Sequence, residues 1–240
     1  MVHEIKFLVP IQTAPALLAW AREHMDGDPH GNGEFQDEYL VQSIYLDTPQ
    51  WHVFRKLGSY GRAKYRVRRY GDENWLFLER KMKRGGIVRK RRTTIQMQEL
   101  PSFGQIDNGR WYEKRLTLRG LAPMCYIQYE RVARQKMTTD GLLRLTVDRG
   151  LRFQTGVEWT WPGTGGSAFL TDSAILELKY LQLPALAKKL IGDFNLNPGP
   201  ASKYRMALRA SPYASQLHAL DPAIAVQTHD DAEGQALRCA

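Results

Sequence analysis

The sequence predicts an α+β protein. Its antiparallel sheet of about eight strands would curl into a barrel or tunnel with a basic lumen and flanking helices. Strand-like segments along most of the chain alternate charged with apolar side chains, as in sheets that have one polar and one apolar face. Short turns rich in glycine and asparagine join several of these segments, as in β-hairpins. Enclosing the charged face would concentrate charge on a ligand, although the sequence does not distinguish a closed barrel from an open sheet.

Length and charge limit the possibilities further. The chain has 240 residues, enough for one large domain or two small ones. We expect one domain over residues 1–210 and a loosely ordered tail over residues 211–240, where no hydrophobic period persists. The 34 lysines and arginines exceed the 25 acidic residues, for a formal charge of +9. Such a balance favours a partner with phosphates, nucleic acid or an anionic membrane surface.

The sequence also bears on location. Its two cysteines, Cys125 and Cys239, make no disulfide framework, which favours a reducing, cytoplasmic compartment. The first residues include charges instead of the apolar segment of a signal peptide. No apolar run approaches the roughly 20 residues that span a bilayer. Any association with a membrane would therefore need a separate membrane protein as partner.

The first half of the chain alternates strands with two helices. A strand ends at Pro10, and a helix with Pro15 in its first turn follows. Strands are expected over residues 4–9, 39–47, 63–70, 75–81 and 87–95. Helices are expected over residues 16–25 and 50–57.

The second half repeats the same design. Within residues 142–148, leucines and a valine alternate with Arg144, Thr146 and Asp148. Strands are expected over residues 124–135, 142–148 and 174–180. Helices are expected over residues 111–118 and 185–194, the second of them opened by Pro184.

Three consecutive strands each place cations on one face of the predicted sheet. The aligned residues are Lys64, Arg66 and Arg68, then Glu79 and Lys81, then Lys90 and Arg92. Like charges opposite one another across strands destabilise a sheet, so a polyanionic ligand would explain these rows. A solvated outer face is the alternative. Glu79 is interpreted as the residue that balances the charge of Lys81.

In their order and spacing, these segments resemble the VTC (vacuolar transporter chaperone) domain. This is the polyphosphate polymerase family of the triphosphate tunnel metalloenzyme superfamily. The resemblance covers nearly everything but the tail, and it implies an antiparallel β-tunnel that holds a triphosphate or polyphosphate chain. Its matching segments are residues 43–48, 64–70, 78–81, 90–92, 129–133, 144–148 and 177–179.

The resemblance also implies roles for individual residues. Those implied to bind phosphate are Lys6, Arg66, Arg68, Lys81, Lys90, Arg92, Arg131, Lys179 and Lys203. Those implied to be catalytic are Arg66, Arg68, Lys81 and Arg131. Glu177, and after it Glu4, would hold Mn²⁺ or Mg²⁺, with a structural ion pair (Glu177 with Lys179) as the alternative. Asp148 is interpreted as a turn residue, with a metal ligand as the alternative.

One departure guides the choice of activity. Hydrolases and cyclases of the superfamily carry Glu-x-Glu-x-Lys on the first strand, whereas this chain has Val2 in place of the first glutamate. The resemblance then implies a polyphosphate polymerase that moves the γ-phosphate of ATP onto a growing polyphosphate chain. The alternatives are a polyphosphate- or triphosphate-binding module without turnover and a triphosphatase of the same superfamily. Nucleic acid is not expected, and any nucleotide would be held by side chains because no P-loop is present. Tyr65, Tyr70 and Trp75 could stack a base or simply pack.

Overall fold

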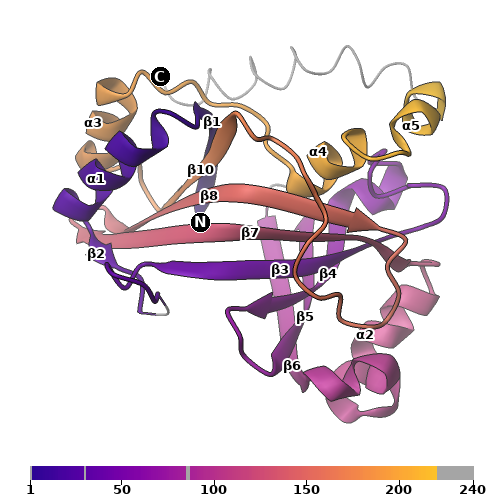
Figure 1. Ribbon diagram of the computed structural model, residues 1–240. Helices are drawn as coiled ribbons and strands as arrows, with labels where there is room; N and C mark the ends of the chain where they lie inside the picture. Colours follow the sequence, from indigo (N-terminus) through magenta and orange to yellow (C-terminus); the bar gives the residue numbers. More distant parts are fainter. Residues whose placement is uncertain (1, 30, 85–86, 221–240) are drawn as a thin grey trace.

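The computed structural model describes residues 2–29, 31–84 and 87–220. Eight strands form one antiparallel path in the order β1-β10-β8-β7-β3-β4-β5-β6 (Figure 1). Two short strands pair at its margins, β2 with β7 and β9 with β8. The strands are β1 (His3–Pro10), β2 (Asp26–Gly27), β3 (Glu38–Asp47), β4 (Ala63–Tyr70), β5 (Trp75–Arg84), β6 (Ile87–Gln96), β7 (Ala122–Thr138), β8 (Gly141–Thr155), β9 (Ser167–Ala168) and β10 (Ser173–Tyr180).

Helices flank this sheet. The α-helices are α1 (Ala14–His24), α2 (Asp107–Thr117), α3 (Ala185–Asp193), α4 (Lys203–Arg209) and α5 (Ala214–Leu220). Two 3-10 helices, η1 (Gly58–Arg62) and η2 (Met97–Gln105), precede β4 and α2. The α+β class and the antiparallel sheet are therefore confirmed, and the predicted strands are present with shifted ends.

The helix predicted over residues 50–57 is wrong. This segment is a series of turns that leads into η1. The buried carboxylate of Asp47 accepts backbone N–H groups from Thr48 (2.7 Å), Val53 (2.7 Å) and Phe54 (2.8 Å). This carboxylate stabilises the turns, and positive φ angles at Trp51 (55°) and Lys56 (56°) are incompatible with a right-handed helix.

Two apolar clusters cover the convex face of the sheet. In the first, Phe7 and Leu145 pack with Leu17 of α1 and Leu190 of α3, and all four are buried. The second joins the outward side chains of β3, β4 and β5 to η2 and α2. Figure 1 shows α1 and α3 together at one end of the sheet and α2 at the other. Burial of each such side chain contributes about 1.5–3 kcal/mol, so this face anchors the fold.

The concave face is divided between apolar and charged side chains. At one end, Tyr45 and Ile127 pack with Tyr204 and Leu208 of α4. The ring of Tyr204 stacks on that of Tyr45 with centroids 5.4 Å apart, and its hydroxyl donates to Asp47 (2.8 Å). We expected helices only on the outside. Instead, α4 lies on the concave face, so the charged lumen occupies part of the interior.

The sheet is not a closed barrel. β1 and β6 are the two ends of its path, and no ladder joins them in the described part of the chain. The free edge of β1 is occupied by another segment: Phe7 bridges to Pro198, and Gly199 donates its N–H to the carbonyl of Lys6 (2.9 Å). Since this segment takes the position of a neighbouring strand, β6 cannot pair with β1. An ion pair between Glu4 and Lys81 (3.3 Å) joins β1 to β5 through side chains only.

The chain continues in regular structure past α4. Helix α5 follows, and its Leu217 is 2% exposed against the apolar cluster of the concave face. Residues 221–240, which form the larger part of the predicted tail, lie outside the described residues. The division at residue 210 remains a prediction.

Candidate anion-binding site

A cavity of about 280 Å³ opens on the concave face, between the strands and the start of α4. Thirteen lysines and arginines line it, against three glutamates. All nine predicted phosphate-binding residues and both candidate metal ligands are among the lining residues. The cation rows therefore face a common space, as the alternation of β4, β5 and β6 indicated. The cavity also takes in Lys64, which the sequence placed in a cation row without a role in binding.

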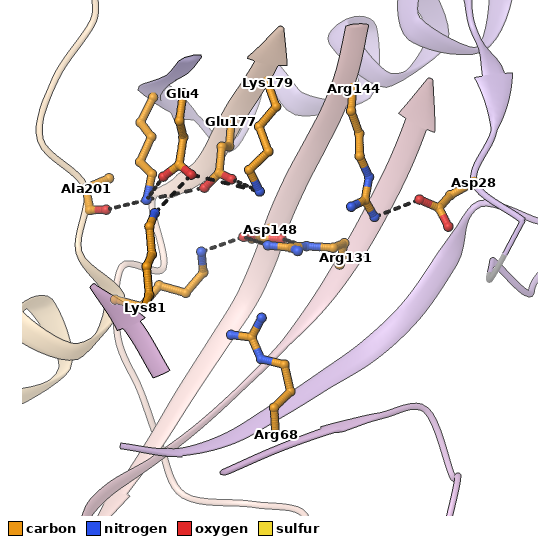
Figure 2. A network of polar contacts seen from close by, with 12 residues as sticks. Glu4, Asp28, Arg68, Lys81, Arg131, Arg144, Asp148, Glu177, Lys179 and Ala201 are labelled. Carbon is orange, nitrogen blue, oxygen red and sulfur yellow. Dashed lines mark hydrogen bonds and ion pairs between the residues drawn. The ribbon is translucent and has the colours of Figure 1, made fainter. Parts of the chain in front are cut away.

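One wall of the cavity carries two carboxylates held by lysines (Figure 2). The ammonium group of Lys6 lies 3.2 Å from Glu4 and 3.2 Å from Glu177, and Lys179 lies 2.5 Å from Glu177. Burial alone would raise the pKa of Glu177, but the charges of Lys6 and Lys179 hold it well below its usual value. The ion pair between Glu177 and Lys179, which was the alternative to a metal-binding role, is therefore present. Glu177 is nonetheless ionised at any ordinary pH and faces the cavity.

Deeper in the same wall, Asp148 holds two cations. Its carboxylate accepts from Arg131 Nε (2.6 Å) and Nη2 (2.8 Å) and lies 2.5 Å from the ammonium of Lys203. Asp148 is 0% exposed, and the two cations lower its pKa to about 2 although burial opposes them. Its interpretation as a turn residue is wrong, because it lies inside β8. The alternation within residues 142–148 had placed Asp148 on the same strand face as Arg144, which lines the cavity. This pattern could have predicted its position.

On the opposite wall, Glu79 joins two arginines. It accepts from Arg66 Nε (2.6 Å) and Arg92 Nε (2.8 Å), and these charges overcome burial to lower its pKa to about 2. The expected pairing of Glu79 with Lys81 is wrong. Arg66 and Arg92 lie directly across from Glu79 in the register, whereas Lys81 lies about 6.6 Å along the strand. Lys81 bonds Glu4 instead.

Arg68 differs from all of these residues. It projects from β4 and is buried, at 4% exposure. Its contacts are neutral oxygens: Ser43 Oγ at 3.0 Å and the hydroxyls of Tyr70 and Tyr129, each at 3.5 Å. No carboxylate ion-pairs with it in the described part of the chain. Glu79 attracts Arg68 electrostatically without forming an ion pair with it. Because a buried guanidinium with no bonded counter-charge is costly, this position favours an external anion.

Lys64 is a second cation without a carboxylate, as far as the described residues show. It lies across from Lys81 in the ladder between β4 and β5. Lys64 is exposed, but its partial desolvation by the surrounding cavity and the charges of Lys6 and Lys81 lower its pKa to about 8. The nearby Tyr45 also titrates low, at a pKa of about 8, because Arg66, Arg68 and Lys203 outweigh its burial. Sequence reasoning assigned Tyr45 no role.

This donor set suits a polyanion together with a divalent cation. Guanidinium groups bond phosphate oxygens in pairs, and lysines act as point charges. The described residues contain no group of three His, Cys, Asp or Glu side chains that could hold a metal by themselves. Glu4 and Glu177 form a pair around one lysine, and Mg²⁺ is commonly held by one or two carboxylates with substrate phosphates supplying other ligands. The pair therefore fits a metal that binds with a phosphate chain.

Comparison with known proteins identifies the family. The sequence profile of the VTC domain matches residues 1–211, so the chain belongs to the VTC domain family. No curated protein matches the chain significantly.

Solved structures agree on the fold. A candidate adenylate cyclase from Bacillus halodurans superposes with a TM-score of 0.53 at 14% identity, covering 83% of this chain and 92% of that one. The Hippeastrum protein HpAC1, a candidate adenylyl cyclase described as having a dominant triphosphatase activity, gives 0.50 at 15% identity, with 88% and 97% covered. The PH1819 protein of Pyrococcus horikoshii gives 0.50 at 13% identity, with 87% and 100% covered. At these identities the likeness shows a shared fold.

Within the described ranges, no helix combines the length and apolar character needed to cross a bilayer.

Proposed function

We propose that the protein is a metal-dependent polyphosphate polymerase that transfers the γ-phosphate of ATP onto the end of a polyphosphate chain in this cavity. The observation that carries the proposal is Arg68, a buried guanidinium whose contacts are all neutral oxygens. A phosphate group would supply the missing negative charge. Membership of the VTC domain family supports the same class of ligand.

The chain's own residues would bind and align the phosphates. Phosphoryl transfer requires positioned reactants and neutralised charge more than covalent help from the protein. Arg66, Arg68 and Arg131 would hold phosphate oxygens by paired hydrogen bonds and fix the line of attack. The lysines that line the cavity would neutralise charge as the chain moves: Lys6, Lys81, Lys90, Lys179 and Lys203, with Arg92 beside them. The terminal oxygen of a phosphate chain is already ionised, so no general base is required.

Glu177 and Glu4 are the residues proposed to hold Mn²⁺ or Mg²⁺. Both carboxylates face the cavity, and the low pKa of Glu177 keeps it ionised. A bound divalent ion would neutralise phosphate oxygens during transfer. Lys6 and Lys179, which hold these carboxylates here, would then be available to phosphate. The cytoplasmic location and the membrane partner remain predictions.

Incubation of the pure protein with ATP and Mn²⁺ tests the proposal. We expect ADP and a ladder of polyphosphate on a gel, both lost in Arg68→Met and both kept in Arg115→Met, which changes an exposed arginine of α2. Phosphate release without polymer would favour a triphosphatase. Binding without either product would favour a module that only holds polyphosphate.

A triphosphatase is the second candidate. Glu4 is kept on β1 and faces the cavity beside Glu177, so two carboxylates are available although the first glutamate of the hydrolase pattern is absent. HpAC1, a protein of the same fold, is described as having a dominant activity of this kind. Release of inorganic phosphate from tripolyphosphate, with no chain growth when polyphosphate is added, would identify it.

A further inference from the structure

β4, β5 and β6 present their inward side chains to the concave face as a grid. In the central row, Arg66, Glu79 and Arg92 lie directly opposite one another. Successive rows on the same face are two residues, about 6.6 Å, apart. The row on one side of the centre consists of Lys64, Lys81 and Lys90. The rows on the other side consist of Arg68, Phe77 and Thr94, and then of Trp75 and Gln96.

The end of the grid at Trp75 is aromatic. Tyr70 contacts Tyr39 and Phe77 edge to face, with centroids 6.0 and 5.6 Å apart, and the guanidinium of Arg92 lies 4.5 Å from the ring of Phe77. Trp75 is the outermost of these rings and is 48% exposed. No ring of the described chain stacks on it. An exposed indole beside a phosphate-binding row offers a flat apolar surface to a ligand.

The other end of the grid is purely cationic. Lys81 lies opposite both Lys64 and Lys90, an arrangement that costs energy in the absence of an anion. Of these three lysines, only Lys81 has a carboxylate partner among the described residues, namely Glu4. Lys64, Lys81 and Lys90 all line the cavity, and Lys64 and Lys90 are exposed. These ammonium groups would bind phosphates without demanding a fixed geometry.

We propose that the site has a direction along this grid, with a different ligand group at each end. The base of ATP stacks on Trp75, and the polyphosphate chain extends over Lys64, Lys81 and Lys90. This inference rests on the proposed function and specifies how its substrates lie. Trp75 is four residues from Glu79, about 13 Å along β5, which leaves the ribose and first phosphates between the indole and the central row. Stacking on an aromatic ring accepts any base, so the Trp75 end selects a nucleoside without selecting its identity.

Binding measurements on two variants test this orientation. Titration calorimetry with Mg²⁺ would give the affinities of wild type, Trp75→Ala and Lys90→Ala for ATP, inorganic tripolyphosphate and long-chain polyphosphate. We expect Trp75→Ala to weaken ATP about tenfold and to leave tripolyphosphate within twofold. Lys90→Ala should weaken long-chain polyphosphate several-fold more than ATP. Trp75→Phe should keep most of the ATP affinity. Lys114→Ala, which changes an exposed lysine of α2, should change nothing.

The outcomes distinguish failure of the proposed function from failure of the proposed substrate orientation. If wild type binds neither ATP nor tripolyphosphate, the proposed function fails, and the orientation fails with it. If both bind and Trp75→Ala weakens them equally or not at all, the proposed function stands and the orientation is wrong. The reverse pattern, in which Trp75→Ala weakens long-chain polyphosphate and Lys90→Ala weakens ATP, would place the base at the lysine end.

Discussion

The two walls of the cavity use their cations differently. On the wall formed by β1, β10, β8 and β7, carboxylates neutralise the cations: Lys6 and Lys179 pair with Glu177, and Arg131 pairs with Asp148. On the wall formed by β4, β5 and β6, one carboxylate, Glu79, serves two arginines, while Arg68 and Lys64 have no carboxylate partner among the described residues. One wall is balanced before any ligand arrives, and the other is complete only with an anion.

This difference assigns separate tasks to the walls. Buried charges that are already paired resist change, since removing one partner leaves the other uncompensated. Substitutions on the balanced wall should therefore damage the fold or the binding of metal. Substitutions on the unbalanced wall should damage anion binding and leave the fold intact.

The largest effect should come from Asp148→Asn, on the balanced wall. Loss of this carboxylate leaves Arg131 and Lys203 buried without a counter-charge, at a cost of about 3–5 kcal/mol in the free energy of unfolding. Urea denaturation measures the loss. Added tripolyphosphate should restore more stability to the variant than to wild type. A loss below about 1 kcal/mol would show that this wall is not held by its ion pairs.

Arg68→Met should have the next largest effect, on binding instead of stability. The variant removes a buried charge that no carboxylate balances, so the free energy of unfolding should stay equal or increase. The affinity for tripolyphosphate should fall about 100-fold, the value of two strong charged hydrogen bonds. Calorimetry with Arg115→Met as the matched control provides the test. If the variant unfolds, Arg68 is structural and the contrast between the walls is lost.

Glu177→Gln should weaken metal dependence. The Mn²⁺ concentration that gives half-maximal tripolyphosphate binding should increase about tenfold, because an amide replaces an ionised ligand. Binding without metal should change less, since Lys6 and Lys179 are freed for phosphate. Glu158→Gln, which changes an exposed glutamate, serves as the control. Equal metal dependence in both variants would leave Glu177 with only its ion pairs.

A smaller effect should appear as the pH increases through about 8. Lys64 then loses its positive charge and Tyr45 gains a negative one, since the pKa of each is about 8. The first change removes an attraction for phosphate and the second adds a repulsion. Affinity for tripolyphosphate should therefore fall about twofold for each charge changed, or about fourfold in all. Calorimetry between pH 7 and 9 measures this fall. Lys64→Met should remove part of the fall and the double variant with Tyr45→Phe the rest. A fall unchanged in the double variant would assign it to other groups.

Much of this fold follows from local patterns in the sequence. Alternation along β4, β5 and β8 is a property of short segments, so it indicated which side chains share a face. It also predicted correctly that Arg66, Lys81 and Lys90 face the same cavity. Partners across the sheet depend on register, which the sequence does not state. Glu79 was therefore assigned to its own strand neighbour Lys81, although Arg66 and Arg92 lie opposite it.

Features that depend on distant segments were missed for the same reason. Closure of the barrel was expected from charge alone, but Pro198 and Gly199 reach the edge of β1 from a loop more than 190 residues away along the chain. The turns at residues 50–57 are held by the Asp47 carboxylate, which accepts the N–H groups of Val53 and Phe54, and by positive φ angles at Trp51 and Lys56. Neither contact leaves a periodic signal. Predicting either contact requires knowledge of which segments lie together in the folded chain.

The open sheet leaves β6 as the last strand of its path. An unpaired strand edge invites the edge of another molecule, and proteins commonly prevent this by placing charges along it. Residues Arg89, Lys90, Arg91 and Arg92 put four consecutive positive charges on that strand. Two such edges repel each other, so the same residues that attract phosphate also protect the protein against self-association, and a strong polyanion at high concentration would weaken that protection.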